Sequence, residues 1–496
     1  MPSSTAHSED LSDPRRSATL SVVRCCDAKG AQNDRQGRSV SAYLDPFDGR
    51  RAHALCGAAD RVIAWRDGVP VTLARFLADV EAIARHLPVA VHAVNLCEDR
   101  YAFIAAFCAV AARGQTNLLP PSRAPRAIDQ VMAIDAQAYA VGDAALEPAP
   151  ARYLRIPNHA FTNVGGADRR SLDIDPQQIV AIGFTSGSTG QPKANTKRWR
   201  DFEIGTRHNA QLLMRTIGLS EGEVASIVAT VPAQHMYGIE MSVLLPLLGP
   251  FAVHAGKPFF PADIAAALAQ TPSPRVLVTT PIHLRNLLLA DTPLPDVAAI
   301  VSATAPLAAD IAALAEQRFA APVIELFGST ETCVIAHRRS ASEDAWRIYD
   351  GVTLRPQPDG TLVEADHIAH PVVLQDVIEL LPEQRFALRG RNADLLEIAG
   401  KRASLGDLTR RLLAVPGVDD GVVFQLDECE AGVRRIAALV VAPSRNVVDI
   451  LDALRRQVDP VFLPRPLRRI ERLPRNETGK LPRAALLAAL TGASDD

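Results

Sequence analysis

The pattern that most limits the fold of this chain is a regular alternation of short apolar runs and amphipathic segments just past its middle. Val276–Thr280 is followed by a helical pattern through Leu289, and Val297–Val301 is followed by another over Ala308–Arg318. A further apolar run, Pro322–Phe327, comes next. Strands that alternate with helices at this spacing form βαβ units. The sequence therefore predicts an α/β protein with a parallel sheet.

Length and local pattern divide the chain into three parts. Its 496 residues are about three times the ~150 of an average domain. Residues 1–40 are rich in Ser, Asp, Arg and Gly and lack periodicity, which predicts a mobile tail. We expect residues 41–389 to form a large domain with mixed or parallel sheets and helices. Residues 390–496, with amphipathic helices near Leu408 and from Val447, are expected to form a small mobile α+β domain.

Composition and charge exclude several classes of protein. The 48% hydrophobic and 22% charged residues are ordinary globular values, which exclude collagen, coiled-coil and wholly disordered proteins. The net charge of −3 gives no general attraction to nucleic acid or anionic membranes. Tyr101–Ala112 is too short to span a bilayer, and Met241–Ala255, which contains Pro and Gly, is expected to be a loop and a strand. We therefore expect a cytoplasmic protein with no membrane span and no nucleic-acid partner.

A loop rich in glycine and hydroxyl residues follows an apolar run that ends near Ile182. Glycines let backbone amides approach an anion, and the hydroxyls and a final Pro–Lys pair add donors, so the loop suits phosphate oxygens. A flexible linker would account for the serines and glycines but not for that final pair. The spacing is neither that of a Walker loop nor GxGxxG. Its candidate binding residues are Thr185, Ser186, Gly187, Ser188, Thr189, Gly190 and Lys193.

The loop resembles the YTSGTTGxPKG signature of the adenylate-forming superfamily of acyl- and aryl-CoA ligases, adenylation domains and luciferases. Five later segments resemble further motifs of this family, in the family's order from about residue 60 to residue 485. They are Pro232–Gly238 (P-x-x-H-x-x-G), Ser302–Leu307 (SGGAPL), Phe327–Glu331 (YGxTE), Asp376 with Gly390–Arg391 (the ribose-binding Asp and the GRxDD hinge) and Pro474–Lys480 (PRTxxGK). The chain is thus identified as a member of this superfamily by resemblance.

The resemblance implies two half-reactions. A small carboxylic acid and ATP give acyl-AMP and pyrophosphate, and a thiol of CoA or of a carrier protein's phosphopantetheine then takes the acyl group. The glycine-rich loop would hold the β- and γ-phosphates, Thr330 would donate to a phosphate oxygen, and Glu331 would bind Mg²⁺. Lys480 would contact the carboxylate and the α-phosphate, and His235 would be an aromatic gate beside the carboxylate. A solvated lysine and a packed core histidine are the ordinary alternatives for these two residues.

The same resemblance places the nucleoside and the acid. Phe327 would stack on adenine, Asp376 would accept from the ribose hydroxyls, and Arg391 would assist the ribose or the hinge. The backbone beside the adenine would come from Thr304, Ala305 and Pro306. Candidate wall residues of the acid pocket are Met236, Gly238, Ile239, Glu240, Ala303, Gly328 and Cys333.

The C-terminal motifs depart from the family pattern. Ala393 stands where the hinge usually has Asp, so the rotation of the small domain is expected to change. Gly400, which lines the approach of the thiol in the family, is present, but the segment to Asp407 is degenerate. These departures bear on thioester formation more than on adenylation.

The nature of the acid is open at this point. No carboxylate stands where amino-acid adenylation domains hold the α-ammonium group, which argues against an α-amino acid. The apolar wall suits a flat aryl ring or a medium acyl chain, and Glu240 could accept from a ring hydroxyl or only pair within the fold. The chain also resembles the stand-alone hydroxybenzoate-activating ligases of aryl-polyene (xanthomonadin-type) pigment synthesis. A fatty-acid ligase and a catalytically reduced nucleotide-binding regulator are the alternatives.

Overall fold

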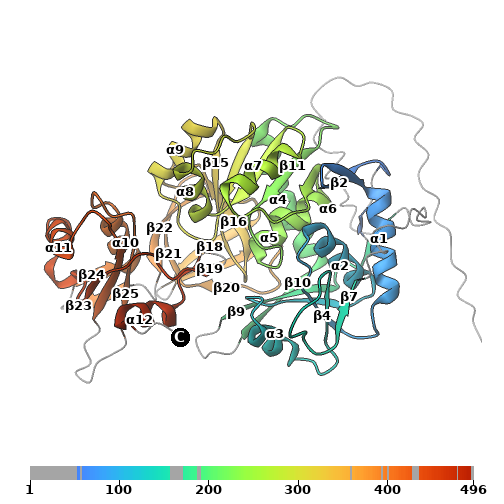
Figure 1. The fold of residues 1–496 in the computed structure, drawn as a ribbon, viewed down its shortest axis with the longest axis horizontal. Coiled ribbons are helices and arrows are strands. Elements are labelled where there is room, and N and C mark those ends of the chain that lie inside the picture. Colours follow the sequence, from blue (N-terminus) through green and yellow to red (C-terminus); the bar gives the residue numbers. More distant parts are fainter. Residues whose placement is uncertain are drawn as a thin grey trace, which may run out of the picture. The chain divides into compact units, whose positions relative to one another are not determined.

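The computed structural model describes residues 53–55, 58–156, 171–186, 192–357, 360–391, 395–398, 401–426, 435–476 and 479–492 (Figure 1). The expected tail, residues 1–40, lies outside this part of the chain, and the expected boundary near residue 390 stays a prediction. No helix in the described ranges combines the length and the apolar character that crossing a bilayer requires.

The largest sheet has eleven strands in the order β21-β22-β17-β16-β15-β14-β13-β11-β12-β2-β3. Its central strands, from β15 to β2, are parallel, which confirms the predicted α/β fold. The bounds are β2 (Val62–Arg66), β3 (Val69–Thr72), β11 (Ala225–Ala229), β12 (Phe251–His254), β13 (Arg275–Thr279), β14 (Ala299–Ser302), β15 (Val323–Ser329), β16 (Cys333–Arg338), β17 (Trp346–Ile348), β21 (Asp376–Leu381) and β22 (Arg385–Arg391).

The predicted βαβ units lie in this sheet. Val276, Leu277 and Val278 of β13 are all fully buried, as expected for a strand covered on both faces. Thr280 then caps α8 by accepting from the backbone of His283, and proline at the first position of the helix needs no hydrogen-bond partner. Helices that cover this sheet are α7 (Pro261–Ala269), α8 (Pro281–Leu289) and α9 (Ala309–Phe319).

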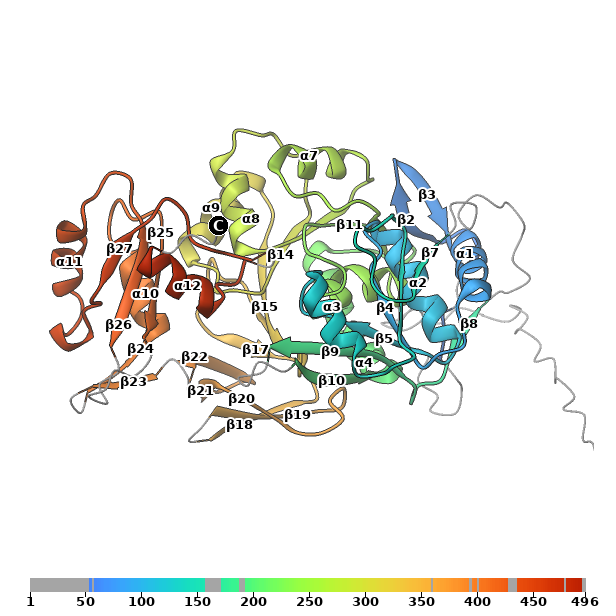
Figure 2. The same ribbon diagram turned by 60° about the horizontal axis from the view of Figure 1, so that its bottom comes forward.

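A second sheet of six strands has the order β10-β9-β5-β4-β6-β7. Four of its five pairings are parallel, and β9 and β10 form an antiparallel pair (Figure 2). Its bounds are β4 (His92–Asn95), β5 (Thr116–Leu119), β6 (Tyr139–Gly142), β7 (Tyr153–Arg155), β9 (Ile179–Ser186) and β10 (Pro192–Arg198). The helices that accompany these strands in the chain are α1 (Leu73–His86), α2 (Arg100–Ala112), α3 (Pro125–Met132) and α4 (Trp199–Ile217).

The expectation of a loop at the start of Met241–Ala255 is wrong. Glu240–Leu244 forms a π-helical turn, η2, between α5 (Met236–Ile239) and α6 (Leu245–Leu248), and only β12 is the expected strand. Pro246 lies in the first turn of α6, directly after η2, where the hydrogen-bonding pattern changes from π-helical to α-helical.

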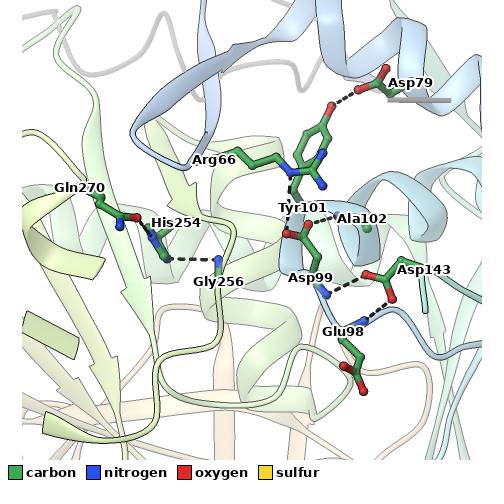
Figure 3. A network of polar contacts seen from close by, with 10 residues as sticks. All are labelled: Arg66, Asp79, Glu98, Asp99, Tyr101, Ala102, Asp143, His254, Gly256 and Gln270. Atoms are coloured by element: carbon green, nitrogen blue, oxygen red, sulfur yellow. Dashed lines mark hydrogen bonds and ion pairs between the residues drawn. The ribbon is translucent and has the colours of Figure 1, made fainter. Parts of the chain in front are cut away.

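Buried polar contacts join α2 to its neighbours (Figure 3). Asp99 caps α2 by accepting from Ala102, and Asp143 accepts from the backbone N–H of Asp99. Two residues after Asp99, the Tyr101 hydroxyl donates to Asp79 of α1 at 2.6 Å. Burial raises the pKa of Asp79, and the hydrogen bond from Tyr101 and the charge and hydrogen bond of Arg75 oppose that rise. The network fixes the position of α2 against α1 and the loop before it.

Arg100 of α2 extends this support toward the core and is 2% exposed. Its guanidinium donates to the carbonyl oxygens of Ala229 and Val231 and to the hydroxyl of Ser242. Ser242 in turn donates to the carbonyl of Gly238 at 2.6 Å. One buried cation therefore fixes both the end of β11 and helix α5, between which the Pro232–Gly238 segment lies.

The C-terminal elements include a three-stranded sheet of their own, with the order β25-β26-β27. The two helices expected near Leu408 and from Val447 are present, with boundaries that differ by a few residues, and strands accompany them, as expected of an α+β region. Their bounds are α10 (Leu405–Leu413), β25 (Asp420–Gln425), β26 (Ile436–Val441), α11 (Val447–Arg455), η4 (Pro460–Phe462), β27 (Leu467–Arg469) and α12 (Arg483–Thr491). The other described strands form three small sheets. These are β1 (His53–Leu55) with β8 (Leu172–Ile174), β18 (Val352–Gln357) with β19 (Gly360–Ala365) and β20 (Val372–Leu374), and β23 (Leu395–Ile398) with β24 (Lys401–Ser404).

Candidate active site

The hairpin between β15 and β16 carries Thr330 and Glu331 at its tip, residues 329–333. Ser329 and Thr332 close the tip, because the backbone N–H of each donates to the side-chain oxygen of the other, at 3.1 and 3.2 Å. Gly328 precedes the tip where a Cβ atom would lie 2.1 Å from the carbonyl oxygen of Cys333, so only glycine fits. These contacts give the two predicted ATP-site residues a defined backbone.

Strand β9 brings the glycine-rich loop to this tip. The Thr185 hydroxyl donates to a carboxylate oxygen of Glu331 at 3.3 Å. A Cβ atom on Gly183 would lie 2.8 Å from the Thr330 methyl group and 3.2 Å from the Met236 methyl group. Three motifs that are far apart in the sequence therefore meet around Gly183, as the predicted site requires.

The rest of the loop is only partly described. Lys193 of β10 lies directly opposite Thr185 in the β9–β10 register, and its side chain is exposed. The side chain of Ser186 and the whole of Gly187, Ser188, Thr189 and Gly190 lie outside the described residues. The phosphate-holding role of the loop stays a prediction.

His235 precedes α5 and is half-buried. Burial, together with the charges of Lys480 and Lys257, lowers the pKa of His235 to about 4. The imidazole is therefore neutral at physiological pH, which suits a gate or packing role better than proton transfer. Gly238 lies where a Cβ atom would be 1.9 Å from the carbonyl oxygen of Pro232, so the close turn of this motif requires glycine.

Lys480 lies in a tight turn of its own. Its backbone N–H donates to the Asn476 side chain at 2.9 Å, and the Asn476 N–H donates back to the Lys480 carbonyl. Arg475 at the start of the turn binds Asp420 of β25 through both carboxylate oxygens. The Lys480 side chain is exposed, and its contact with the carboxylate and the α-phosphate stays a prediction.

Glu240, in the first position of η2, is 2% exposed. Its carboxylate accepts from the backbone N–H of Val334 at 3.1 Å and from the Asn209 side chain at 3.3 Å. Burial raises the pKa of Glu240 to about 7, against the lowering effects of the Val334 hydrogen bond, the charge of Lys197 and the Asn209 hydrogen bond. Within the described ranges its contacts are hydrogen bonds rather than an ion pair.

The other predicted pocket residues differ in burial. Met236, Gly238, Ile239, Ala303 and Cys333 are buried, whereas Gly328 is exposed. The hydroxyl of Tyr237, on the same short helix, donates to the carbonyl oxygens of Thr279 and Val301. That side chain therefore fixes α5 on the ends of β13 and β14.

The predicted adenine and ribose residues lie on neighbouring strands of the large sheet. Phe327 is half-buried, and its ring packs 5.3 Å from Trp346 and 5.5 Å from Phe386. Asp376 is 8% exposed and lies directly opposite Arg391 in the β21–β22 register. Strand pairing thus brings together the two residues that are predicted to contact the ribose and to serve the hinge.

The segment that follows β14 carries a sign of backbone strain. Thr304 has φ +82°, a conformation that side chains other than glycine rarely adopt. Of the two residues that follow it, Ala305 is half-buried and Pro306 is exposed. Strain at this point agrees with a backbone shaped for a ligand, as predicted for the adenine side of the site.

Some predicted positions cannot be placed. Gly400, Ala393 and the Arg391 side chain lie outside the described residues, so the hinge and the thiol approach stay predictions. Conversely, sequence reasoning missed Lys197 and Asn209, which contact Glu331 and Glu240. Neither residue belongs to a motif, and the sequence carried no signal for them.

The residues present fit a magnesium ion bound mainly through phosphates and water. No group of three or more His, Cys, Asp or Glu side chains able to hold a metal occurs among the described residues. Mg²⁺ in nucleotide sites uses one or two carboxylates together with phosphate oxygens and waters. Glu331, a half-buried carboxylate beside the predicted phosphate loop, is such a ligand.

Known proteins are similar to this chain in sequence or in fold. 4-Coumarate–CoA ligase from Halorhodospira halophila is 28% identical over 309 residues, which cover 60% of this chain and 73% of that protein. 3-Hydroxybenzoate–CoA/4-hydroxybenzoate–CoA ligase from Thauera aromatica is 25% identical over 386 residues, covering 68% and 72%. o-Succinylbenzoate–CoA synthetase from Bacillus subtilis, solved with ATP and a magnesium ion, has the same fold, with a TM-score of 0.72 at 16% identity over 86% of this chain and 96% of that one.

The model of one family, described as AMP-binding enzyme, matches residues 59–363, which is more than half of the chain. The matched range includes the glycine-rich loop, the His235 segment and the Thr330–Glu331 tip. This protein therefore belongs to the AMP-binding family of adenylate-forming enzymes.

Proposed function

We propose that this protein activates a small carboxylic acid with ATP, giving acyl-AMP and pyrophosphate, and then transfers the acyl group to a thiol. The observation that carries the proposal is the meeting of Thr185, Thr330 and Glu331 with the His235 segment around Gly183. A phosphate-binding loop, a metal-binding carboxylate and an acid-binding segment are the three parts that such a reaction needs in one place.

In the first half-reaction, a carboxylate oxygen of the acid attacks the α-phosphorus of ATP, and the bond to pyrophosphate breaks. Catalysis comes from positioning and charge, because two anions must approach one another. Lys480 would stabilise the charge that develops between the carboxylate and the α-phosphate. The loop hydroxyls with Lys193 would hold the β- and γ-phosphates, and Mg²⁺, when bound by Glu331, neutralises charge on the phosphates.

The nucleoside would be held by the strands beside the tip. Phe327 would stack on adenine, with the strained backbone at Thr304 on the same site. Asp376 would accept from the ribose hydroxyls, with Arg391 opposite it. In the second half-reaction the thiol sulfur attacks the acyl carbonyl and AMP leaves, and we infer that Gly400 lines the approach of the thiol.

The acid is proposed to be an aryl acid such as a hydroxybenzoate. The coumarate and hydroxybenzoate ligases among the relatives support this class. The buried carboxylate of Glu240 supports it too, because an ionised carboxylate has about four acceptor sites and a ring hydroxyl can fill one of them. CoA and a separate carrier protein are both candidate acceptors, and a fatty acid is the alternative substrate.

We expect hydroxybenzoates to outcompete octanoate in ATP–pyrophosphate exchange. If Glu240 faces the acid, hydroxylated rings should also react faster than benzoate, because an unpaired buried acceptor costs about 1–3 kcal/mol. Preference for octanoate and longer chains would replace the aryl proposal with the fatty-acid alternative. If none of these acids supports exchange, the protein would be a nucleotide-binding protein without adenylation activity, as in the regulator alternative.

The control for this selectivity is Glu240→Gln, measured between pH 6 and pH 8. The pKa of Glu240 is raised to about 7, so the wild-type carboxylate gains charge, and with it acceptor strength, as pH rises through this range. The preference for hydroxybenzoate over benzoate should therefore increase with pH in the wild type and stay flat in the variant. Identical pH profiles in both proteins would remove Glu240 from substrate recognition.

A further inference from the structure

Lys197 of β10 is a buried lysine next to the predicted metal ligand. Its side chain lies in the interior, with the residue 3% exposed. Its ammonium group donates to the main-chain carbonyl oxygen of Glu331 at 2.6 Å. The contact is with the backbone of Glu331, so it leaves the carboxylate of that residue available for a ligand.

The surroundings of Lys197 explain how a charge is tolerated there. Burial raises the pKa of Cys333 to about 12, and the Lys197 charge and a hydrogen bond from Lys197 oppose this. The same charge acts on the buried carboxylate of Glu240 and on His367, and Asp201 acts on Cys333 and His367. A buried ammonium is costly unless its surroundings compensate it. Nearby carboxylates and a carbonyl acceptor therefore offset the cost of burying the Lys197 ammonium group.

The tip of the hairpin is held from several sides. Lys197 binds the Glu331 carbonyl, and a ring nitrogen of His367 lies 3.0 Å from the Thr332 carbonyl oxygen. Burial lowers the pKa of His367 to about 4, with the charges of His208 and Lys197 acting in the same direction, so the ring is neutral and donates through this nitrogen. Thr185 binds the carboxylate of Glu331 itself. Together these contacts come from three elements outside the hairpin.

We propose that Lys197 is a positioning residue, which fixes the backbone of the tip at residues 329–333 and thereby aims the Glu331 carboxylate at the magnesium ion of the ATP complex. The metal-orienting part of this inference rests on the proposed function. The part that concerns the backbone of the tip does not depend on it. In this proposal Lys197 is not itself a ligand of the substrate or the metal, and it acts on the metal site through the Glu331 carbonyl.

The structural part is tested by hydrogen–deuterium exchange of the tip without any ligand. The variants are Lys197→Met, which keeps length and removes the donor, and Lys197→Arg, which keeps a charged donor. The matched control is Thr196→Ala, which changes the exposed neighbouring position on the same strand. We expect the amides of Ser329 and Thr332 to exchange at least several-fold faster in Lys197→Met, and at near wild-type rates in the other two proteins.

The functional part is tested by the Mg²⁺ dependence of pyrophosphate release. Loss of a group that orients a metal ligand lowers metal affinity or activity by about 10–100-fold. Lys197→Met should therefore raise the half-saturating Mg²⁺ concentration by about 10-fold, while the KM for the acid changes little. Lys197→Arg should recover most of this loss.

Each outcome supports or overturns the inference. Unchanged exchange at the tip in folded Lys197→Met, or an equal loss in Lys197→Met and Lys197→Arg, would overturn it. An equal rise in the KM for the acid would show a general structural role instead. If Lys197→Met does not fold, Lys197→Gln, which is too short to reach the Glu331 carbonyl, takes its place. A wild-type protein that releases no pyrophosphate would contradict the proposed function, while the exchange result at the tip would still be readable.

Discussion

Lys480→Ala is expected to lose acyl-AMP formation by about 10²–10³-fold, the range seen when one key electrostatic group is removed from an active site. Lys480 follows a left-handed glycine in a turn that Asn476 closes, so its backbone is defined, and the proposed role falls to its exposed side chain. Its charge opposes the repulsion between the carboxylate and the α-phosphate. Single-turnover formation of acyl-AMP from saturating acid and ATP measures this loss.

The same variant should convert supplied acyl-AMP to thioester at a near-normal rate. In that step no phosphorus–oxygen bond forms, so the charge of Lys480 has no task. The exposed Arg472 is the matched control, and Arg472→Ala should leave both steps unchanged. Equal losses in both half-reactions would make Lys480 a structural residue. Supplying CoA and a phosphopantetheinyl carrier protein in separate reactions identifies the acceptor. If the wild-type protein transfers the acyl group to neither thiol, the degenerate segment from Gly400 to Asp407 has lost the function of this step.

Glu331→Gln is expected to lower the adenylation rate by about 10²-fold or more. The substitution keeps the size of the side chain and an oxygen that can accept from Thr185, but it removes the charge that suits Mg²⁺. Initial rates of pyrophosphate release over a range of Mg²⁺ concentrations measure the effect, and part of the loss should return at high Mg²⁺.

The control for this variant is Glu383→Gln, which removes an exposed carboxylate from the β21–β22 turn. It should leave the Mg²⁺ dependence unchanged. If Glu331→Gln kept the wild-type rate and Mg²⁺ dependence, Glu331 would not be the metal ligand. The positioning role proposed for Lys197 would then be lost as well.

The parallel sheet could be predicted from sequence because its signal is local. β13 has an unbroken run of buried Val and Leu, and α8 begins with a capping threonine followed by proline. Both features depend on neighbours within a few residues. The expectation for Met241–Ala255 was wrong for the converse reason. Pro246 indicates a break in a helix, but in the structure the helical segment runs on through it, with a π-helical turn just before it.

The candidate site was predicted only as far as motifs extend. The motif residues Thr185, Thr330, Glu331 and Met236 lie together in the structure, but their sequence order alone gives no distances. The Lys197 contact could not be predicted, because it depends on which face of β10 turns inward and on the register of that strand.

Glu240 shows the same limit from the other direction. The sequence left two interpretations open, recognition of a hydroxyl or an ion pair within the fold. Its contacts with Val334 and Asn209 come from β16 and α4, elements that are distant in the sequence. A single sequence carries no information on such a pairing, since each partner is unremarkable in its own segment.

The measurement that tests the central claim most directly is the identity of the products formed from ATP. Wild-type protein mixed with ATP, Mg²⁺ and a hydroxybenzoate, without any thiol, should form acyl-AMP and pyrophosphate in amounts no greater than those of the enzyme. On addition of the accepting thiol, AMP and thioester should then accumulate over many turnovers. Phosphorus NMR and mass spectrometry distinguish these species. Formation of ADP and phosphate, or of no product with any acid of the panel, would contradict the account.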